Sequence, residues 1–161
     1  SLSNSYEITK WHQFNNNMIA DINLYGKMIN SANNKNVRVS KRVNLSSNRL
    51  RGFETGKLGP KDGKDYVGGN YAAALNVSTT LPMFLQNFES IDLKYFIDAG
   101  NVWGVDYSDT VDNTNTIRSS TGLAINWLTP IGPMNFALIQ NISKASTDKV
   151  ETFQFNIGTS F

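Results

Sequence analysis

The chain has 161 residues, of which 40% are hydrophobic and only 17% are charged, and its net charge is +2. This length suffices for one domain with a core, but the charged fraction is below the roughly 25% that is usual in soluble proteins. The absence of cysteine excludes disulfides and thiolate metal sites. A single histidine, His12, excludes a His-rich metal site and is expected at a surface or an interface.

Targeting and nucleic-acid signals are missing from the sequence. No apolar run approaches the roughly 20 residues of a transmembrane helix, and no charged segment precedes an apolar one as in a signal peptide, so we expect a mature protein or a piece of one. The densest basic group lacks interleaved aromatic residues, and we expect it in a solvated loop or strand edge that binds no nucleic acid: Lys35, Arg38, Lys41 and Arg42.

Apolar and polar residues alternate along most of the chain, which is the pattern of β-strands with two different faces. The alternation predicts strands, and no helix, at residues 6–14, 18–28, 69–81, 91–103, 117–128, 134–142 and 151–161. A polar stretch at about 29–68, rich in Asn, Ser, Lys and Gly, predicts a long loop. Short turns at 15–17 and 129–133 alternate with longer loops at 104–116 and 143–149, an asymmetry typical of outer-membrane barrels.

The last predicted strand has the clearest alternation. Phe153, Phe155 and Ile157 share one face, small or polar residues share the other, and the strand runs to Phe161. Such a strand suits a barrel wall with lipid on one side and a wet lumen on the other. Three tryptophans lie near predicted strand ends, where an aromatic girdle would sit: Trp11, Trp103 and Trp127.

The same alternation also describes a soluble β-sandwich or a lipocalin-like barrel, in which the apolar face is the core. Pattern alone leaves the membrane and soluble interpretations level. The polar face favours the membrane, because it is built mainly from Ser, Gly, Ala and Asn and carries few charges, whereas solvent faces of soluble sheets usually carry more Lys and Glu.

Several motifs resemble those of the BamA-type outer-membrane assembly factors. Residues 49–53 (RLRGF) resemble the (V/I)RG(F/Y) motif, which in that family lies at the tip of a long loop folded back into the barrel lumen. Three further segments resemble motifs of the family and follow one another in the same order as there. Residues 95–103 resemble the FxDxGxVW strand, residues 120–133 resemble the SxGxxxxWxSPxGP hairpin, and residues 153–158 resemble the terminal strand.

The resemblance implies an all-β fold, an antiparallel transmembrane β-barrel, of which residues 1–161 would be about seven C-terminal strands out of 16, without the preceding POTRA domains. It implies an insertase of the bacterial outer membrane that folds and inserts β-barrel proteins through a lateral seam. The implied partners are outer-membrane lipid, unfolded client proteins and, in the full-length protein, assembly lipoproteins. Alternatives are a TamA-like factor or two-partner secretion transporter of the same superfamily and, more distantly, a passive porin or a soluble β-sandwich binding module.

The resemblance also assigns a loop lock made of Arg51, Gly52, Phe53 and Asp98. Alternation puts Asp98 on the lumen face, where an arginine carried inward on a loop can make a bidentate contact with its carboxylate. In the family a second acid often joins this contact from the preceding strand. The matching position here is Asn76, which removes one charge.

The final strand would form the seam, where it pairs loosely with the first strand of the barrel and a client strand can add to its edge. The residues assigned to this role are Phe153, Phe155, Ile157, Gly158 and Phe161. No catalytic constellation and no cofactor motif is present, so we do not expect an enzyme. Three aspartates in one loop lack the glycine and glutamate of a calcium loop, and we expect no metal there: Asp106, Asp109 and Asp112.

Overall fold

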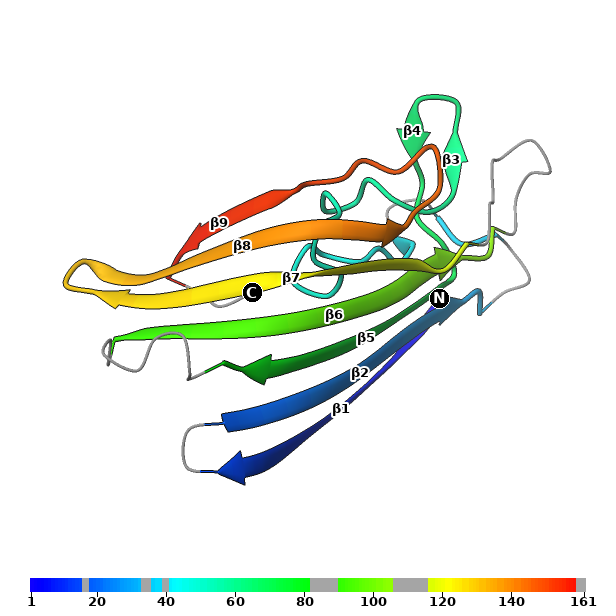
Figure 1. Ribbon diagram of the computed structural model, residues 1–161. Helices are drawn as coiled ribbons and strands as arrows, with labels where there is room; N and C mark the ends of the chain where they lie inside the picture. The colour runs from blue at the N-terminus through cyan, green and yellow to red at the C-terminus, as the bar shows by residue number, and fades with distance from the viewer. Residues whose placement is uncertain (16–17, 33–35, 39–40, 82–89, 106–115, 159–161) are drawn as a thin grey trace.

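Strands that follow one another along the chain lie side by side in one antiparallel seven-stranded sheet of order β1-β2-β5-β6-β7-β8-β9 (Figure 1). The computed structural model describes residues 1–15, 18–32, 36–38, 41–81, 90–105 and 116–158. The sheet consists of β1 (Leu2–Asn15), β2 (Met18–Asn30), β5 (Tyr71–Thr80), β6 (Ile91–Trp103), β7 (Arg118–Thr129), β8 (Gly132–Ser143) and β9 (Phe153–Ile157). Within the described ranges, no helix is long and apolar enough to cross a membrane. The predicted all-β antiparallel architecture is confirmed.

Several strand boundaries differ from the sequence-based prediction, among them those of β1, β2 and β9. β1 begins at Leu2, because pairing with almost the whole of β2 compensates for its weak alternation. The predicted loop at 29–68 begins later, since Ile29 and Asn30 still belong to β2, and it contains a hairpin of β3 (Lys61–Asp62) and β4 (Asp65–Tyr66). β9 is shorter than predicted and ends at Ile157, whereas Phe161 lies outside the described residues.

The two faces of the sheet differ in the way that the alternation predicts, but the apolar face is the exposed one. Ile97 and Leu138 are 46% and 55% exposed on the convex face. On the concave face, Phe96, Asp98 and Ser120 are fully buried. A soluble sandwich would bury its apolar face, so this distribution contradicts the soluble alternative and fits a wall that faces lipid.

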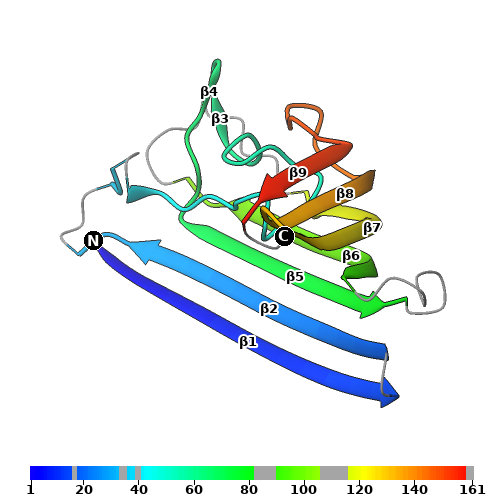
Figure 2. The same ribbon diagram turned by 90° about the vertical axis from the view of Figure 1, so that its left-hand side faces the viewer.

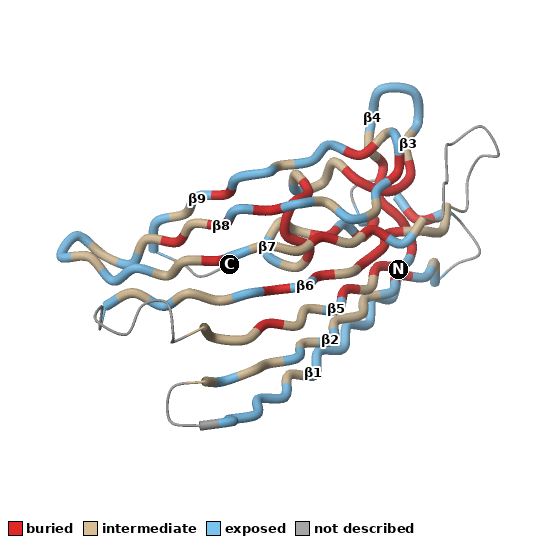
Figure 3. The backbone as a smooth tube through the Cα atoms, in the orientation of Figure 1, coloured by how far each residue is buried: buried red, intermediate tan, exposed pale blue. Residues whose placement is uncertain are grey.

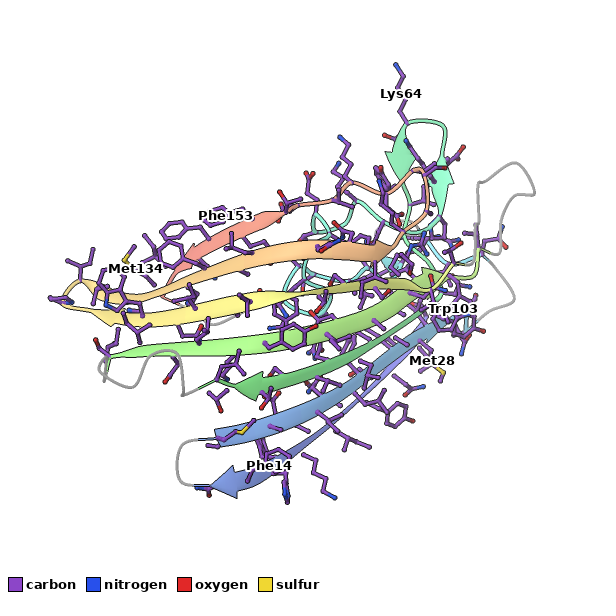
Figure 4. The ribbon with its side chains drawn as sticks, viewed as in Figure 1. Phe14, Met28, Lys64, Trp103, Met134 and Phe153 are labelled. Carbon is purple, nitrogen blue, oxygen red and sulfur yellow. The ribbon has the colours of Figure 1, made fainter. Side chains whose placement is uncertain are left out.

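The tryptophans do not all belong to the convex face. Trp103 pairs with Tyr71 and Trp127 pairs with Ile91, and these pairs lie on the convex face at opposite ends of the strands. Figure 4 shows Trp103 at one end of the sheet and Met134, which pairs with Trp127, at the other. The girdle expectation is wrong for Trp11, because its pairing with Asp21 places it on the concave face.

A segment at residues 41–69, hereafter the inward loop, lies within the curve of the sheet (Figure 2). Its apolar side chains and small residues of the wall form a buried core on the concave side: Val43, Leu45, Leu50, Phe53 and Leu58 from the loop, and Ala72, Ala74 and Val102 from β5 and β6. Buried residues are concentrated where the inward loop lies against the sheet (Figure 3). The wall therefore buries its concave face against its own loop.

Candidate functional site

The base of the inward loop is closed by backbone and side-chain hydrogen bonds. Val43 and Gly69 each donate an N–H to the other's carbonyl, at 2.8 and 3.0 Å. Arg42 is buried and donates from Nη1 to Asn70 Oδ1 and from Nη2 to the Val37 carbonyl, both at 3.0 Å. The expectation of a solvated basic group is therefore wrong for Arg42, because protein oxygens replace water around its guanidinium. The other described members of that group are exposed: Arg38 and Lys41.

At the tip of the loop, Arg51 contacts Asp98 of β6 through three hydrogen bonds. Arg51 Nε lies 2.6 Å from Asp98 Oδ2 and Nη2 lies 2.8 Å from Oδ1, a bidentate pair, while the Arg51 backbone N–H donates to Oδ2 at 3.1 Å. The guanidinium carbon also lies 3.8 Å from the centre of the Phe96 ring. Both charged side chains are almost completely removed from water, so each depends on the other for its charge to be tolerated.

Gly52 and Phe53 follow in the same turn. Gly52 has φ +92°, and a Cβ there would lie 2.6 Å from Ile139 Cγ2, so both the conformation and the close approach require glycine. Its carbonyl accepts hydrogen bonds from Asn141 Nδ2 at 3.0 Å and from the Glu151 N–H at 2.9 Å. Phe53 is fully buried in the core under the loop.

Asn76 has a contact that a carboxylate in its place would lack. It pairs directly with Asp98 across β5 and β6, and its Nδ2 donates to the Arg49 carbonyl at 2.7 Å. An ionised acid has no hydrogen to donate to a carbonyl, so Asn76 replaces a charge interaction with a bond to the loop backbone. Arg49 itself reaches β1, where Nη1 lies 2.6 Å from Glu7 Oε1, and its guanidinium stacks on the Tyr25 ring at 3.8 Å.

A second buried ion pair, which was not predicted from the sequence, joins β7 to the β8–β9 connection. Arg118 Nε lies 2.8 Å from Asp148 Oδ2, and Nη2 lies 3.1 Å from Oδ1. Both side chains are completely buried, and Arg118 Nη1 also donates to Asn101 Oδ1. The available signal was the position of Arg118 on the polar face of its strand, since a cation there requires a partner.

β9, the strand predicted to form the seam, is an edge strand of the described sheet and pairs with β8 over five positions. Phe136 of β8 lies 6.3 Å from the Phe153 ring and 5.1 Å from the Phe155 ring, measured between ring centres, on the convex face. Gly158 follows with φ +96°, which ends the extended conformation, and its N–H donates to the Pro133 carbonyl at 2.8 Å.

The chemistry available at this site is binding and positioning. Among the described residues, no three His, Asp or Glu side chains lie close enough to hold a metal ion. The aspartates at 106, 109 and 112 fall outside those ranges. The solitary His12 is exposed and contacts the Phe14 ring edge-on at 4.6 Å between ring centres.

Comparison with known proteins identifies the family. The profile of the Omp85 superfamily domain matches residues 2–161. The chain belongs to the Omp85 superfamily. The crystal structure of BamA from Haemophilus ducreyi lacking POTRA domains 1–3 superposes with a TM-score of 0.82 at 23% identity, over 95% of this chain and 34% of that one. This likeness confirms the predicted fold.

Individual Omp85 relatives agree with the resemblance read from the motifs. The outer membrane protein assembly factor BamA of Neisseria meningitidis is 34% identical over 70% of this chain, and that of Neorickettsia risticii is 29% identical over 71%. A SAM50-like protein of Schizosaccharomyces pombe is 30% identical over 83% of the chain. The chain spans 17% and 16% of the two bacterial relatives and 30% of the yeast one.

In this Omp85 chain the predicted site residues form two groups. Arg51, Gly52, Phe53 and Asp98 meet on the concave side. The described residues of the predicted seam lie apart from them, on and just after β9, which is an edge strand of the described sheet: Phe153, Phe155, Ile157 and Gly158. Residues 149–151 link the two groups, because their backbone is hydrogen-bonded to the loop that carries Arg51 and continues directly into β9.

Proposed function

We propose that residues 1–161 are the C-terminal part of the barrel of a bacterial outer-membrane assembly factor, which folds and inserts β-barrel proteins through a seam at β9. The observation that carries this proposal is the distribution of burial: an exposed apolar convex face and a polar concave face on which Arg51 holds a loop against Asp98. The names of the two bacterial relatives support the same function.

The proposed mechanism uses backbone pairing and no covalent chemistry, so the protein acts without enzymatic turnover. A strand with a free edge presents unpaired N–H and C=O groups to which an extended client segment can add. β9 is joined to β8 by only five paired positions, whereas β1 and β2 share thirteen. A short pairing is easier to separate and rejoin, and the inward loop keeps the neighbouring wall in register while β9 exchanges partners.

The partners follow from the faces of the wall. Outer-membrane lipid covers the convex face, unfolded outer-membrane proteins engage the seam, and assembly lipoproteins bind the full-length protein outside these strands. Nucleic acid has no part. A passive porin is disfavoured, because the inward loop and the concave wall share a buried apolar core, whereas a porin keeps an aqueous channel inside its wall.

The test uses the full-length protein in lipid vesicles, with an unfolded outer-membrane β-barrel protein diluted from denaturant as client. We expect the client to become protease-protected and heat-modifiable faster than in protein-free vesicles. Equal rates with and without the protein would reject an insertase. A client found free in the vesicle lumen, and not in the bilayer, would favour a two-partner secretion transporter.

Arg51→Ala tests the site, and Arg49→Ala is its matched control. Both variants remove one arginine from the same loop, but Arg51 is buried against Asp98, whereas Arg49 and Glu7 remain 30% and 47% exposed. We expect Arg51→Ala to slow client insertion much more than Arg49→Ala. Similar rates for the two variants would separate the loop lock from the insertion activity.

A further inference from the structure

The segment of residues 147–151, which Thr152 joins to β9, is bonded to the inward loop along its length; we call it the root of β9. The Glu151 N–H donates to the Gly52 carbonyl at 2.9 Å, and the Glu54 N–H donates to the Lys149 carbonyl at 3.0 Å. The Lys149 N–H in turn donates to the Lys57 carbonyl at 2.9 Å. The root therefore pairs with the loop nearly as a strand would, starting one residue after the arginine of the loop lock.

Asp148 holds the root in place through contacts on three sides. Its carboxylate accepts the two hydrogen bonds from Arg118 of β7, and Oδ2 also accepts from the Ala145 N–H at 2.8 Å. Oδ1 faces the Gly59 N–H of the inward loop at 3.4 Å. A carboxylate with this many donors, and no exposure to water, is the point where β7, the root and the loop meet.

A further contact also holds the root, whereas the far end of β9, in the part of the chain that the structure describes, has a single backbone bond after its last pair. The Tyr66 hydroxyl, on the β3–β4 hairpin, donates to the Thr147 carbonyl. Figure 4 shows that hairpin, with Lys64 at its tip, rising above the sheet on the same side as the β8–β9 connection. At the other end of β9, the bond from Gly158 to Pro133 is the backbone contact that follows the last paired position. Among the described residues, β9 therefore has more contacts at its root than at its far end.

We propose that Arg118 and Asp148 are positioning residues that couple the inward loop to the seam strand. The inference rests on the proposed function, because it assigns regulation of the same seam. When Arg51 is bound to Asp98, the loop presents the backbone groups of Gly52, Glu54 and Lys57 to the root, and Asp148 keeps the root there. Release of the loop removes those groups, and the start of β9 is freed.

The coupling is tested by hydrogen–deuterium exchange of the full-length protein in detergent micelles, which needs no client and no insertion activity. We expect Asp148→Asn to speed exchange at least tenfold in residues 52–59 and 147–157 together, while amides of β5 and β6 keep their rates. Glu7→Gln is the matched control, since it also neutralises a carboxylate bound to an arginine, but that arginine is Arg49 and the bonds between the loop and the root are made by Gly52, Glu54 and Lys57. Faster exchange confined to residues 144–149 would overturn the proposal.

A double-variant cycle separates coupling from a merely local effect. If the two ion pairs act in one chain of contacts, Arg51→Ala and Asp148→Asn should each speed hydrogen exchange of the root. The exchange rate in the double variant should then be less than threefold above that of the faster single variant. Multiplying effects would show that the pairs are independent and refute the inference. Arg118→Lys, which retains the charge but not the fork, provides the same test if Asp148→Asn does not fold. If the exchange data show the coupling but the protein inserts no client, the proposed function is refuted and the coupling stands.

Discussion

Asp98→Asn replaces one carboxylate oxygen of the loop lock with an amide NH2 group and leaves the shape of the side chain nearly unchanged. The carboxylate accepts three hydrogen bonds from Arg51, two from the guanidinium and one from the backbone. An asparagine has one accepting oxygen and one donating nitrogen. Whichever way the amide turns, at least one donor of Arg51 faces another donor, and the guanidinium loses the neighbouring negative charge.

The magnitude follows from the burial of both partners. Breaking a buried ion pair by removing one charge costs about 3–5 kcal/mol, and the side chains of Arg51 and Asp98 are 7% and 0% exposed. Taking about 3 kcal/mol for undocking of the loop tip, and a tenfold change for every 1.4 kcal/mol, local opening becomes about 100-fold more frequent. The comparable change at Glu7, whose side chain is 47% exposed, costs about 1 kcal/mol at most, or about fivefold.

Hydrogen–deuterium exchange of residues 49–54 in the full-length protein measures this opening directly. We expect Asp98→Asn to speed exchange there by about two orders of magnitude relative to the unaltered protein, and Glu7→Gln to remain within about fivefold of it. Equal rates for the two variants, or an unchanged rate for Asp98→Asn, would refute the argument that the buried pair holds the loop.

Other changes give equally specific outcomes. Gly52→Ala should undock the loop in the same exchange assay while Gly56→Ala should not, because both glycines have positive φ but only at Gly52 does a new Cβ meet other atoms. Burial, together with the negative charges of Asp148 and Glu54, raises the pKa of Tyr66 above its ordinary 10.0. The contribution of this phenol to stability is present below pH 10 and is lost as the pH rises through the folded value, so Tyr66→Phe should remove one phenol with a raised pKa from an ultraviolet titration and abolish that loss. Ile97→Arg, on the convex face, should impair folding into vesicles by about 2–4 kcal/mol, whereas Asn126→Arg, on the concave face, should fold normally; equal folding yields would contradict the assignment of the faces.

The wall of the barrel was largely predictable from the sequence, because a strand between lipid and water alternates with period two. That period alone assigns Asp98 and Ile97 to opposite faces, and they lie on the concave and the convex face respectively. It failed for the ends of strands. β1 depends on its partner strand, and β9 ends where Gly158 adopts a positive φ, and neither property is local to an alternating pattern.

The site was less predictable, since its contacts join residues far apart in the chain. Arg51 and Asp98 are 47 positions apart, and only the family resemblance paired them. No comparable motif marks Arg118 and Asp148, 30 positions apart. The bond from Asn76 to the Arg49 carbonyl depends on the route of the inward loop across the wall. Residue types predicted which groups need partners, whereas the path of the loop decided which partners they have.

The uneven attachment of β9 has a mechanical consequence. A force that pulls Gly158 away from the sheet would first break its bond to Pro133 and then separate β9 from β8 one pair at a time, from Ile157 back to Phe153, because the bonds are loaded in succession. The force would then reach the root, where the backbone bonds to the inward loop and the Arg118–Asp148 pair are loaded together. The strand should therefore peel easily over five residues and resist sharply at residue 151.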